Sequence, residues 1–308
     1  MNQEPKSRSL EQSLEGLQRA IIEREEREGK QLKPAATAKI IQFPLPFGED
    51  TRAVSNPFAR CSLFAAVNER QHFNDWVFIG EINGVVIEFK GEQFNQDEHD
   101  TLIQLVKSAL HKGLGQDIEI PVNAILRGLG RSTHKSQRQQ LFKEIDRLVS
   151  GSIRFTPKGK PSYHGHIVED TTTPQDQAVL PVYRRGLKYR LNAKFAGFYD
   201  PANYTLIDRT ERQKLGRSPL LRWLHLWIVG NAEQYQHKVE TIRQKCGSKT
   251  KELKKFRQLL RAALDELKTT DIITGWEIDG DDLVHIVRTP SPSQQKHITK
   301  KANRKPAK

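Results

Sequence analysis

The stretch VETIRQKCGSKTKELKKFRQLLRAALDELK, residues 239–268, decides the fold. Its apolar residues recur at helical spacing over residues 239–245 and 249–268, and Cys246-Gly247-Ser248 separates the two runs. In the longer run the apolar residues share one face and the lysines share the opposite one. Two helices across a short turn predict a helix-turn-helix unit. Residues 271–278 and 283–288, joined through Asp279-Gly280, predict a β-hairpin after it, which makes a winged helix.

The same order of elements is predicted earlier in the chain. A short strand at residues 118–120 precedes a helix at 121–129, a turn with two glycines, and a helix at 133–149. A hairpin follows, with strands at 153–156 and 163–169 and a Pro/Gly/Lys turn at 157–161. Other predicted elements are a hairpin over 76–79 and 85–89 and helices over 97–111 and 218–229. The predicted fold class is therefore α+β, with two tandem winged-helix domains.

The length of 308 residues suits two domains of ordinary size. We predict a flexible N-terminal arm over residues 1–55, the first winged-helix domain over 56–190 and the second over 191–288. Residues 289–308 carry six basic residues and no acid among several prolines, and are predicted to be a basic disordered tail.

The chain has an excess of 13 positive charges, from 50 Lys and Arg against 37 Asp and Glu, which indicates a polyanionic partner. Part of this excess falls on residues 237–268, which carry ten basic and four acidic residues. A Lys-rich helix face is often only solvated. Here the lysines lie on the second helix of a helix-turn-helix unit, the helix that such units place in the major groove, and this favours double-stranded DNA as the partner.

Candidate DNA-binding residues follow from this geometry. Ser248 is predicted to cap the second helix, so that the helix N-terminus faces a phosphate. Lysines and arginines on the exposed face are expected to bind phosphates, and Gln258 with Arg257 or Arg261 can make bidentate contacts to bases. The candidates in this unit are Ser248, Lys249, Thr250, Lys251, Lys254, Lys255, Arg257, Gln258 and Arg261.

The first unit offers a polar face that is richer in amide groups than in charge, which suits base reading, although glutamine is also common on exposed helices. Lys158 and Lys160, at the tip of the first hairpin, are expected to reach a neighbouring phosphate or the minor groove, and an ordinary Lys/Gly/Pro turn is the alternative. Arg217 and Arg222, near the helix at 218–229, are expected to contact the DNA backbone. The acidic tip of the second hairpin is not. The helix candidates of the first unit are Arg131, His134, Lys135, Ser136, Gln139, Gln140, Lys143 and Arg147.

Several other classes of protein are disfavoured. Two distant cysteines support neither a disulfide framework nor a cysteine zinc site, and no apolar stretch approaches the length of a membrane span, so a bacterial cytoplasmic protein is expected. No glycine-rich phosphate-binding loop is present, and we expect no cofactor, no metal and no enzymatic activity. One alternative stays open: His164-Gly165-His166 could hold a divalent metal for DNA nicking. The candidate nucleophiles would be Tyr183, Tyr189, Tyr199 and Tyr204.

Specific strings resemble plasmid replication initiators of the TrfA family, over roughly residues 40–288. They are VETIR at 239–243, CGS at 246–248, LDEL at 264–267, Trp276 followed by DDLVH at 281–285, NPFARCSLF at 56–64 and FAG at 195–197. The resemblance implies two winged helices that bind origin repeats, called iterons, and help open the adjacent A+T-rich DNA. Single-stranded origin DNA is then a further candidate ligand, and a transcriptional regulator or autorepressor is the alternative function.

The resemblance also implies host partners: the replicative helicase, the host initiator protein and the polymerase sliding clamp. It further implies a monomer–dimer equilibrium. In the family a Gln-Leu-x-Leu-Phe motif binds the clamp, and the corresponding string here is QFPLPF at 42–47. The candidate clamp-binding residues are therefore Gln42, Phe43, Leu45 and Phe47. Because the string has Phe in place of Leu and an inserted proline, an extended Pro-rich linker is the competing interpretation.

Overall fold

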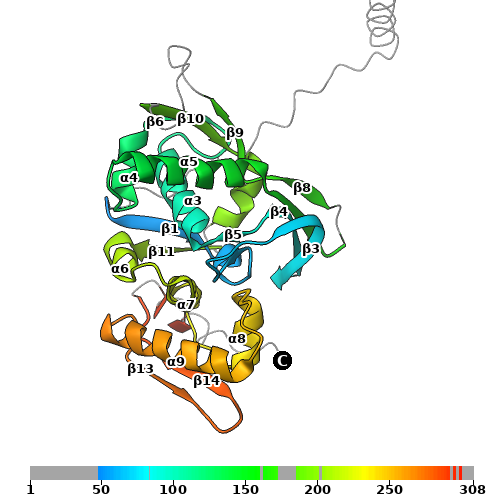
Figure 1. Cartoon of the computed structure of the whole chain (residues 1–308), viewed down its shortest axis with the longest axis vertical. Helices are drawn as coiled ribbons and strands as arrows, with labels where there is room; N and C mark the ends of the chain where they lie inside the picture. Colours follow the sequence, from blue (N-terminus) through cyan, green and yellow to red (C-terminus); the bar gives the residue numbers. More distant parts are fainter. Residues whose placement is uncertain are drawn as a thin grey trace, which may run out of the picture. The chain divides into compact units, whose positions relative to one another are not determined.

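The structure, a computed structural model, describes residues 48–82, 84–159, 162–172, 185–200, 203–291, 294–295 and 298–299. All of them belong to the unit that spans residues 40–308 (Figure 1). We call residues 48–208 the first half and residues 209–291 the second half. Within the described residues, no helix is long and apolar enough to cross a membrane.

The first half mixes helices with strands that pair antiparallel, except for the parallel pair β2 and β5 (Figure 1). Its helix α3 starts at a clear signal, because Asn95 and Glu98 form a capping box there. Its elements are β1 (Thr51–Ser55), α2 (Asn56–Ala59), β2 (Phe64–Ala65), β3 (His72–Ile82), β4 (Val85–Glu92), β5 (Phe94–Asn95), α3 (Gln96–Ala109), β6 (Asp117–Pro121), α4 (Val122–Gly128), α5 (Lys135–Ser150), β7 (Ser152–Pro157), β8 (Tyr163–His166), β9 (Val168–Thr172), β10 (Gly186–Leu191), the 3-10 helix η2 (Ala193–Tyr199) and β11 (Tyr204–Asp208).

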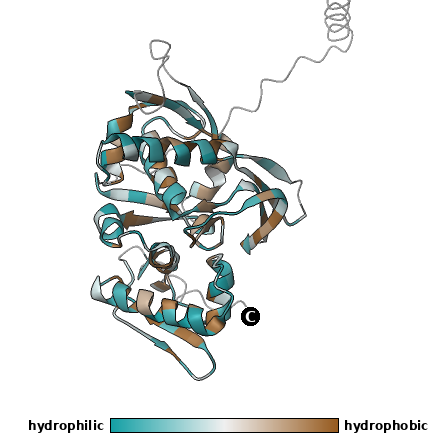
Figure 2. Ribbon diagram, in the orientation of Figure 1, coloured by the Kyte–Doolittle hydropathy of each residue, from teal (hydrophilic) through white to brown (hydrophobic). Residues whose placement is uncertain are grey.

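The second half is mostly helical. Ser218 caps α7, and Pro219 follows at the first helical position, where its missing N–H group costs no hydrogen bond. The elements are α6 (Arg209–Lys214), α7 (Pro219–Val229), β12 (His237–Lys238), α8 (Val239–Lys245), α9 (Leu253–Thr269), β13 (Gly275–Ile278) and β14 (Leu283–Val287). In Figure 2, α7 is coloured mainly as hydrophobic, whereas α5 and α9 mix hydrophilic and hydrophobic residues.

One order of elements occurs in both halves. A helix (α3 or α7) is followed by a strand (β6 or β12), two helices (α4 and α5, or α8 and α9) and two antiparallel strands. In both cases the early strand pairs with the last strand, giving the sheet orders β6-β10-β9 and β12-β14-β13. The first half differs by the insertion of β7 and β8 between α5 and β9.

The turns between the paired helices are also alike. Gly130 after α4 and Gly247 after α8 both have positive φ, +69° and +65°, where a side chain is strained. In both turns the next residue's N–H donates to a carbonyl near the helix end: Arg131 to Leu126 (2.8 Å) and Ser248 to Arg243 (3.1 Å). A pair of helices joined across a glycine turn therefore occurs twice.

Two clusters of buried apolar side chains form the core, one mainly in each half. The first includes the inner faces of α3, α5 and the sheets, and the second is built on α7, α8 and α9. On α9 the residues Phe256, Leu260 and Leu264 are fully buried, as the helical spacing predicts. Burying each such side chain stabilises the fold by about 1.5–3 kcal/mol. Ile103 of α3 joins the second cluster, so the two halves share a packed boundary.

Several predicted boundaries are wrong. Residues 51–55, assigned to the flexible arm, form β1, which pairs with β11, and Ala53 and Val54 are buried. At the other end, the Gln294 side chain, within the predicted tail of residues 289–308, donates to the carbonyl of Val229 (2.8 Å) and so contacts the fold. The first buried core also extends past residue 190 to Phe195 and Tyr199.

The predicted hairpin after the first helix pair exists, but it has a different place in the fold. β7 pairs with β8, and β7 also pairs with β4, which produces a four-stranded sheet in the order β3-β4-β7-β8. The strands that correspond to the β13–β14 hairpin of the second half are instead β9 and β10. The predicted first hairpin therefore does not have the place that β13 and β14 have in the second half.

Candidate nucleic-acid interface

The exposed side of α5 carries five of the predicted DNA-binding residues. α5 begins at Lys135 rather than at residue 133, because His134 has an extended backbone and occupies the N-cap position without a capping hydrogen bond. Exposed on this helix or at its start are His134, Lys135, Ser136, Gln139 and Lys143. The opposite face, with Leu141, Ile145 and Leu148, is buried in the first core.

The other three candidates of the first unit bind carboxylates of the protein itself. Arg131 forms an ion pair with Glu144 (2.8 Å), whose side chain has no exposed surface, and Gln140 donates to the same carboxylate (3.0 Å). Arg147 pairs with Glu92 (2.8 Å) and Glu98 (3.1 Å). These side chains hold α5 in place. They were predicted to bind DNA, but in the structure they are bound to carboxylates of the first half.

The exposed face of α9 is basic. Lys251, just before the helix, and Lys254, Lys255, Gln258 and Arg261 on it are exposed. Arg257 is the exception, because it makes two hydrogen bonds to Asp282 (2.7 and 2.9 Å) beside the β13–β14 turn. Within the described residues, α9 therefore presents cations without carboxylate partners along one side and a buried apolar side opposite.

The segment that leads into α9 differs from the prediction. The helix begins at Leu253 with Glu252 at the N-cap position, so Ser248 does not cap it; the Ser248 hydroxyl accepts from the N–H of Thr250 (3.3 Å) instead. Arg243 of α8 donates to the carbonyls of Thr250 (2.7 Å) and Lys251 (2.9 Å), which holds this segment out of the helix. Sequence reasoning missed Arg243 because its role depends on carbonyls that carry no sequence signal.

The remaining basic candidates separate into exposed and buried groups. Lys158 and Arg217 are exposed, and Lys160 lies outside the described residues. Lys249 is exposed and donates to the carbonyl of Glu69 (2.7 Å) in the first half. Arg222 is buried in ion pairs with Asp97 (2.7 Å) and Asp100 (2.5 Å), so its assignment to the DNA backbone is wrong.

The candidate clamp-binding residues Gln42, Phe43, Leu45 and Phe47 lie outside the described residues.

The candidate nicking residues do not gather at one place. His164 packs edge-on to the Trp76 ring (6.2 Å between centroids), and Nδ1 of His166 lies 3.2 Å from the carbonyl of Gly151. Tyr189 and Tyr199 are buried, and burial raises the pKa of both phenols. Tyr183 lies outside the described residues. Among the described residues, no group of three His, Cys, Asp or Glu side chains is placed to hold a metal ion.

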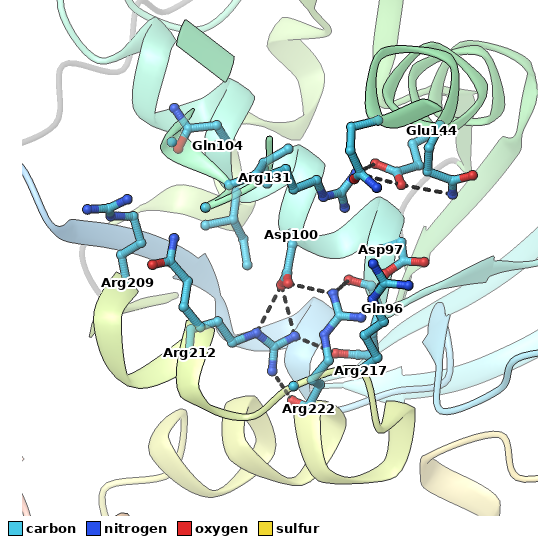
Figure 3. A pocket seen from close by; sticks show the side chains of 18 of the residues that line it. Gln96, Asp97, Asp100, Gln104, Arg131, Glu144, Arg209, Arg212, Arg217 and Arg222 are labelled. Carbon is cyan, nitrogen blue, oxygen red and sulfur yellow. Dashed lines mark hydrogen bonds and ion pairs between the residues drawn. The ribbon is translucent and has the colours of Figure 1, made fainter. Parts of the chain in front are cut away.

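A cleft of about 790 Å³ lies beside α5, between it and the segment from α6 to α7 (Figure 3). Six arginines line it, together with Ser132, Ser136 and Gln137 of the α5 region: Arg52, Arg131, Arg209, Arg212, Arg217 and Arg222. Sequence reasoning missed Arg209 and Arg212, although the density of basic residues in RTERQKLGRSPLLR, residues 209–222, is a signal that could have found them.

The floor of the cleft joins the halves through the largely buried carboxylate of Asp100, whose side chain is 19% exposed. Burial alone would raise the pKa of Asp100, but the guanidinium groups of Arg212 and Arg222 outweigh it and hold the pKa well below its usual range. Two buried histidines lie nearby, His99 on α3 and His225 on α7, and among the described residues none of their ring nitrogens has a hydrogen-bond partner. Burial, reinforced by the charge of Arg212, lowers the pKa of each to about 3, so both rings are neutral.

Comparison with solved structures supports the α+β fold. The chain is similar to domains 2 and 3 of RctB in two crystal structures. One, of selenomethionine derivatives, has a TM-score of 0.53 at 14% identity and covers 76% of this chain and 98% of the other. The second has a TM-score of 0.50 at 14% identity and covers 79% and 99%.

Comparison with characterised sequences identifies the family. The chain is 24% identical over 250 residues to the plasmid replication initiator protein TrfA of Escherichia coli, covering 79% of this chain and 63% of that protein. The chain thus spans less than two thirds of that relative. The sequence pattern of the family described as TrfA protein matches residues 11–288. The match covers most of the chain, which therefore belongs to the TrfA family.

Proposed function

We propose that the chain is a plasmid replication initiator that binds repeated sites, or iterons, in a plasmid origin through two winged helices. The observation that carries this proposal is the repeated order of elements, in which α5 and α9 each follow a short helix across a glycine turn and present an exposed polar face. In such units the second helix enters the major groove. Membership of the TrfA family supports the same activity.

The exposed residues of the two helices have different chemistry, and we assign them different tasks. Lys251, Lys254, Lys255 and Arg261 would neutralise phosphates and supply affinity, whereas Ser136 and Gln139 on α5 can bind base edges. Lys143 and Arg217 would add phosphate contacts beside α5. In this proposal the chain acts in the bacterial cytoplasm, without catalysis and without a cofactor.

A footprint on the DNA that flanks the gene tests the binding. Regularly spaced protected repeats are expected from the wild-type chain at moderate salt. The triple variant Lys251→Ala, Lys254→Ala, Lys255→Ala should lose about tenfold or more in affinity, because each lost phosphate contact removes one released counterion. A matched control, Lys90→Ala, Lys112→Ala, Lys194→Ala, loses the same charge from exposed residues outside α5 and α9 and should keep the footprint. Equal losses in both variants would contradict the proposed interface.

Replication itself separates an initiator from a transcriptional regulator. A plasmid that carries only this gene and the protected repeats should replicate in a permissive host, and the triple lysine variant should not support it. A regulator would bind the same repeats without sustaining the plasmid. Nicking is tested on supercoiled repeat DNA with Mg²⁺ or Mn²⁺: nicked circles that disappear with His164→Ala and His166→Ala would establish an enzyme instead.

The initiator would also recruit the host helicase, the host initiator protein and the sliding clamp, contact single-stranded DNA in the opened origin, and interconvert between monomer and dimer. The clamp contact can be tested alone. Gln42→Ala with Leu45→Ala should abolish clamp pull-down and leave repeat binding unchanged, since both residues precede the described fold. Undiminished recovery of the clamp would identify this segment as a linker.

A further inference from the structure

The cleft beside α5 is rich in arginine, but its positive charges are used within the protein. Five of its six arginines bind side chains or carbonyls of the chain: Arg52, Arg131, Arg209, Arg212 and Arg222. An anionic ligand would have to compete with these partners. The cleft is therefore better explained as a junction between the halves than as a ligand site.

Asp100 is the centre of this junction (Figure 3). Its carboxylate, on α3 of the first half, accepts from Nε of Arg212 on α6 (2.9 Å) and from Nη2 of Arg222 on α7 (2.5 Å). Gln96, one turn earlier on α3, accepts from both arginines, through its side-chain oxygen (2.8 Å) and its carbonyl (2.9 Å). Arg212 also donates to the carbonyl of Arg222, so three helices are tied at one carboxylate.

The burial of these groups makes the junction stiff. The side chains of Arg212 and Arg222 are only 7% and 9% exposed, and that of Asp100 is 19% exposed. Water therefore cannot readily replace Asp100 as their partner, and removal of one member of a buried pair leaves an uncompensated charge. Asp97 supplies a second, more exposed carboxylate to Arg222 (2.7 Å).

The junction connects the two exposed helices mechanically. α3 is bonded to α5 through Thr101, whose hydroxyl donates to Glu144 (2.5 Å), and α7 packs with α9 in the second buried cluster. Next to Arg222, Nε1 of Trp223 donates to the carbonyl of Cys61 in the first half (3.2 Å). At the other end of α7, Nη2 of Arg60 donates to the carbonyl of Gly230 (2.6 Å). α7 is thus held at several points, and loss of the Asp100 contacts would let its N-terminal end move about the attachment at Gly230.

We propose that Asp100 is a positioning residue that fixes the separation and angle between α5 and α9, and thereby the spacing of the two DNA segments that the chain binds together. This inference rests on the proposed function. Two linked binding modules gain affinity only when the linkage matches the distance between their sites. Inserted base pairs both lengthen the DNA and rotate one segment, since a helical turn takes about 10 base pairs.

The test uses the protected repeat with zero, one, two and five base pairs inserted between the parts that α5 and α9 protect. Wild-type affinity should fall about tenfold or more on insertion of two base pairs. Asp100→Asn should bind the unmodified repeat more weakly. Its loss of affinity on insertion of two base pairs, the spacing penalty, should be less than about threefold, because the halves can move to match the new spacing. The full chain is used throughout.

Tyr189→Phe is the matched control. The hydroxyl of Tyr189 is buried and donates to the carbonyl of Leu105 on α3 (2.7 Å), so the variant weakens α3 packing within the first half and leaves the junction intact. It should keep the full spacing penalty even if its melting temperature falls as far as that of Asp100→Asn. A reduced penalty in this control would assign the effect to general destabilisation and overturn the positioning role.

A milder variant covers the case in which Asp100→Asn does not fold. Asp97→Asn removes only the second carboxylate of Arg222 and should reduce the penalty partly. If the wild-type chain binds the repeat and both variants retain its full spacing penalty, the positioning role is wrong and the proposed function stands. If the wild-type chain binds no repeat at all, both fail.

Discussion

α5 and α9 occupy equivalent places in the repeated order of elements, yet their polar side chains are neutralised differently. On and just before α5, Arg131, Gln140 and Arg147 bind carboxylates of the first half. Along α9, by contrast, Lys254, Lys255 and Arg261 are exposed, and within the described residues none of them is ion-paired. For the proposed DNA binding, α5 would offer a fixed polar surface suited to reading shape and bases, whereas α9 would offer exposed charges suited to phosphates.

The largest expected effect tests whether the α5 carboxylates are structural. Glu144 is fully buried and accepts hydrogen bonds from Thr101, Arg131 and Gln140. Burial raises the pKa of its carboxyl group, and the charge of Arg131 opposes this effect. Glu144→Ala leaves these donors without their acceptor and should lower the free energy of unfolding by about 3–5 kcal/mol. Urea denaturation at pH 7 measures the loss.

The control is an acid on the other helix. Glu266 is exposed on α9, and Glu266→Ala should change the free energy of unfolding by less than about 0.5 kcal/mol. Comparable losses in the two variants would show that the two helices do not differ in this respect.

The second prediction concerns acid, because each half contributes one buried neutral histidine to the junction, His99 and His225. Their pKa is about 3 in the folded chain and near 6.5 when unfolded, so only the unfolded chain takes up protons between these values. Stability therefore falls as the pH drops from 6.5 towards 3. At pH 5 the loss is about 2 kcal/mol for each histidine relative to pH 7 and above.

His225→Leu should remove about half of this dependence, since leucine fills the buried space without a titrating group. Denaturation at pH 7 and pH 5 measures the difference between the variant and the wild-type chain. The same loss of stability at pH 5 in both would mean that His225 does not control the acid response.

The two helix pairs could be predicted from sequence because their signals are local. Helical spacing of apolar residues and the glycines after α4 and α8 act over a few residues, and α8 has the predicted bounds, residues 239–245. The start of α9 could not be predicted, because Arg243 of the preceding helix binds the carbonyls of Thr250 and Lys251. A tertiary contact of this kind overrides local helix preference.

The place of the first predicted hairpin in the fold was missed for a related reason. The turn signals between β7 and β8 are real, but the pairing of β7 with β4 joins residues more than 60 positions apart and has no local signature. Likewise, sequence alone shows the charge of Arg131, Arg147 and Arg222 but not their partners. Acids placed next to apolar positions, such as Glu144 beside Ile145, are the only hint that these arginines turn inward.

The third prediction tests base reading by α5. Gln139 is exposed, and an amide side chain can bind adenine through two hydrogen bonds. Gln139→Ala should reduce discrimination at one base pair of the repeat by about 1–3 kcal/mol and leave the salt dependence unchanged. Competition binding against singly substituted repeats measures this change. A uniform loss over all sequences would instead assign Gln139 to the DNA backbone.

The smallest expected effect compares two cations on α9 that differ in their partners. Lys254 is exposed, whereas the guanidinium group of Arg257 is hydrogen-bonded to Asp282. This carboxylate raises the pKa of Arg257 and balances its positive charge within the protein. Lys254→Ala should reduce the slope of log affinity against log salt by about 0.9, the value for one phosphate contact, or about threefold in affinity between 50 and 200 mM salt. Arg257→Ala should leave the slope nearly unchanged, because its charge is already balanced by Asp282. If both variants have the same slope as the wild-type chain, Lys254 is not part of the interface. If the slope decreases equally in both variants, pairing within the protein does not decide which cations of α9 bind DNA.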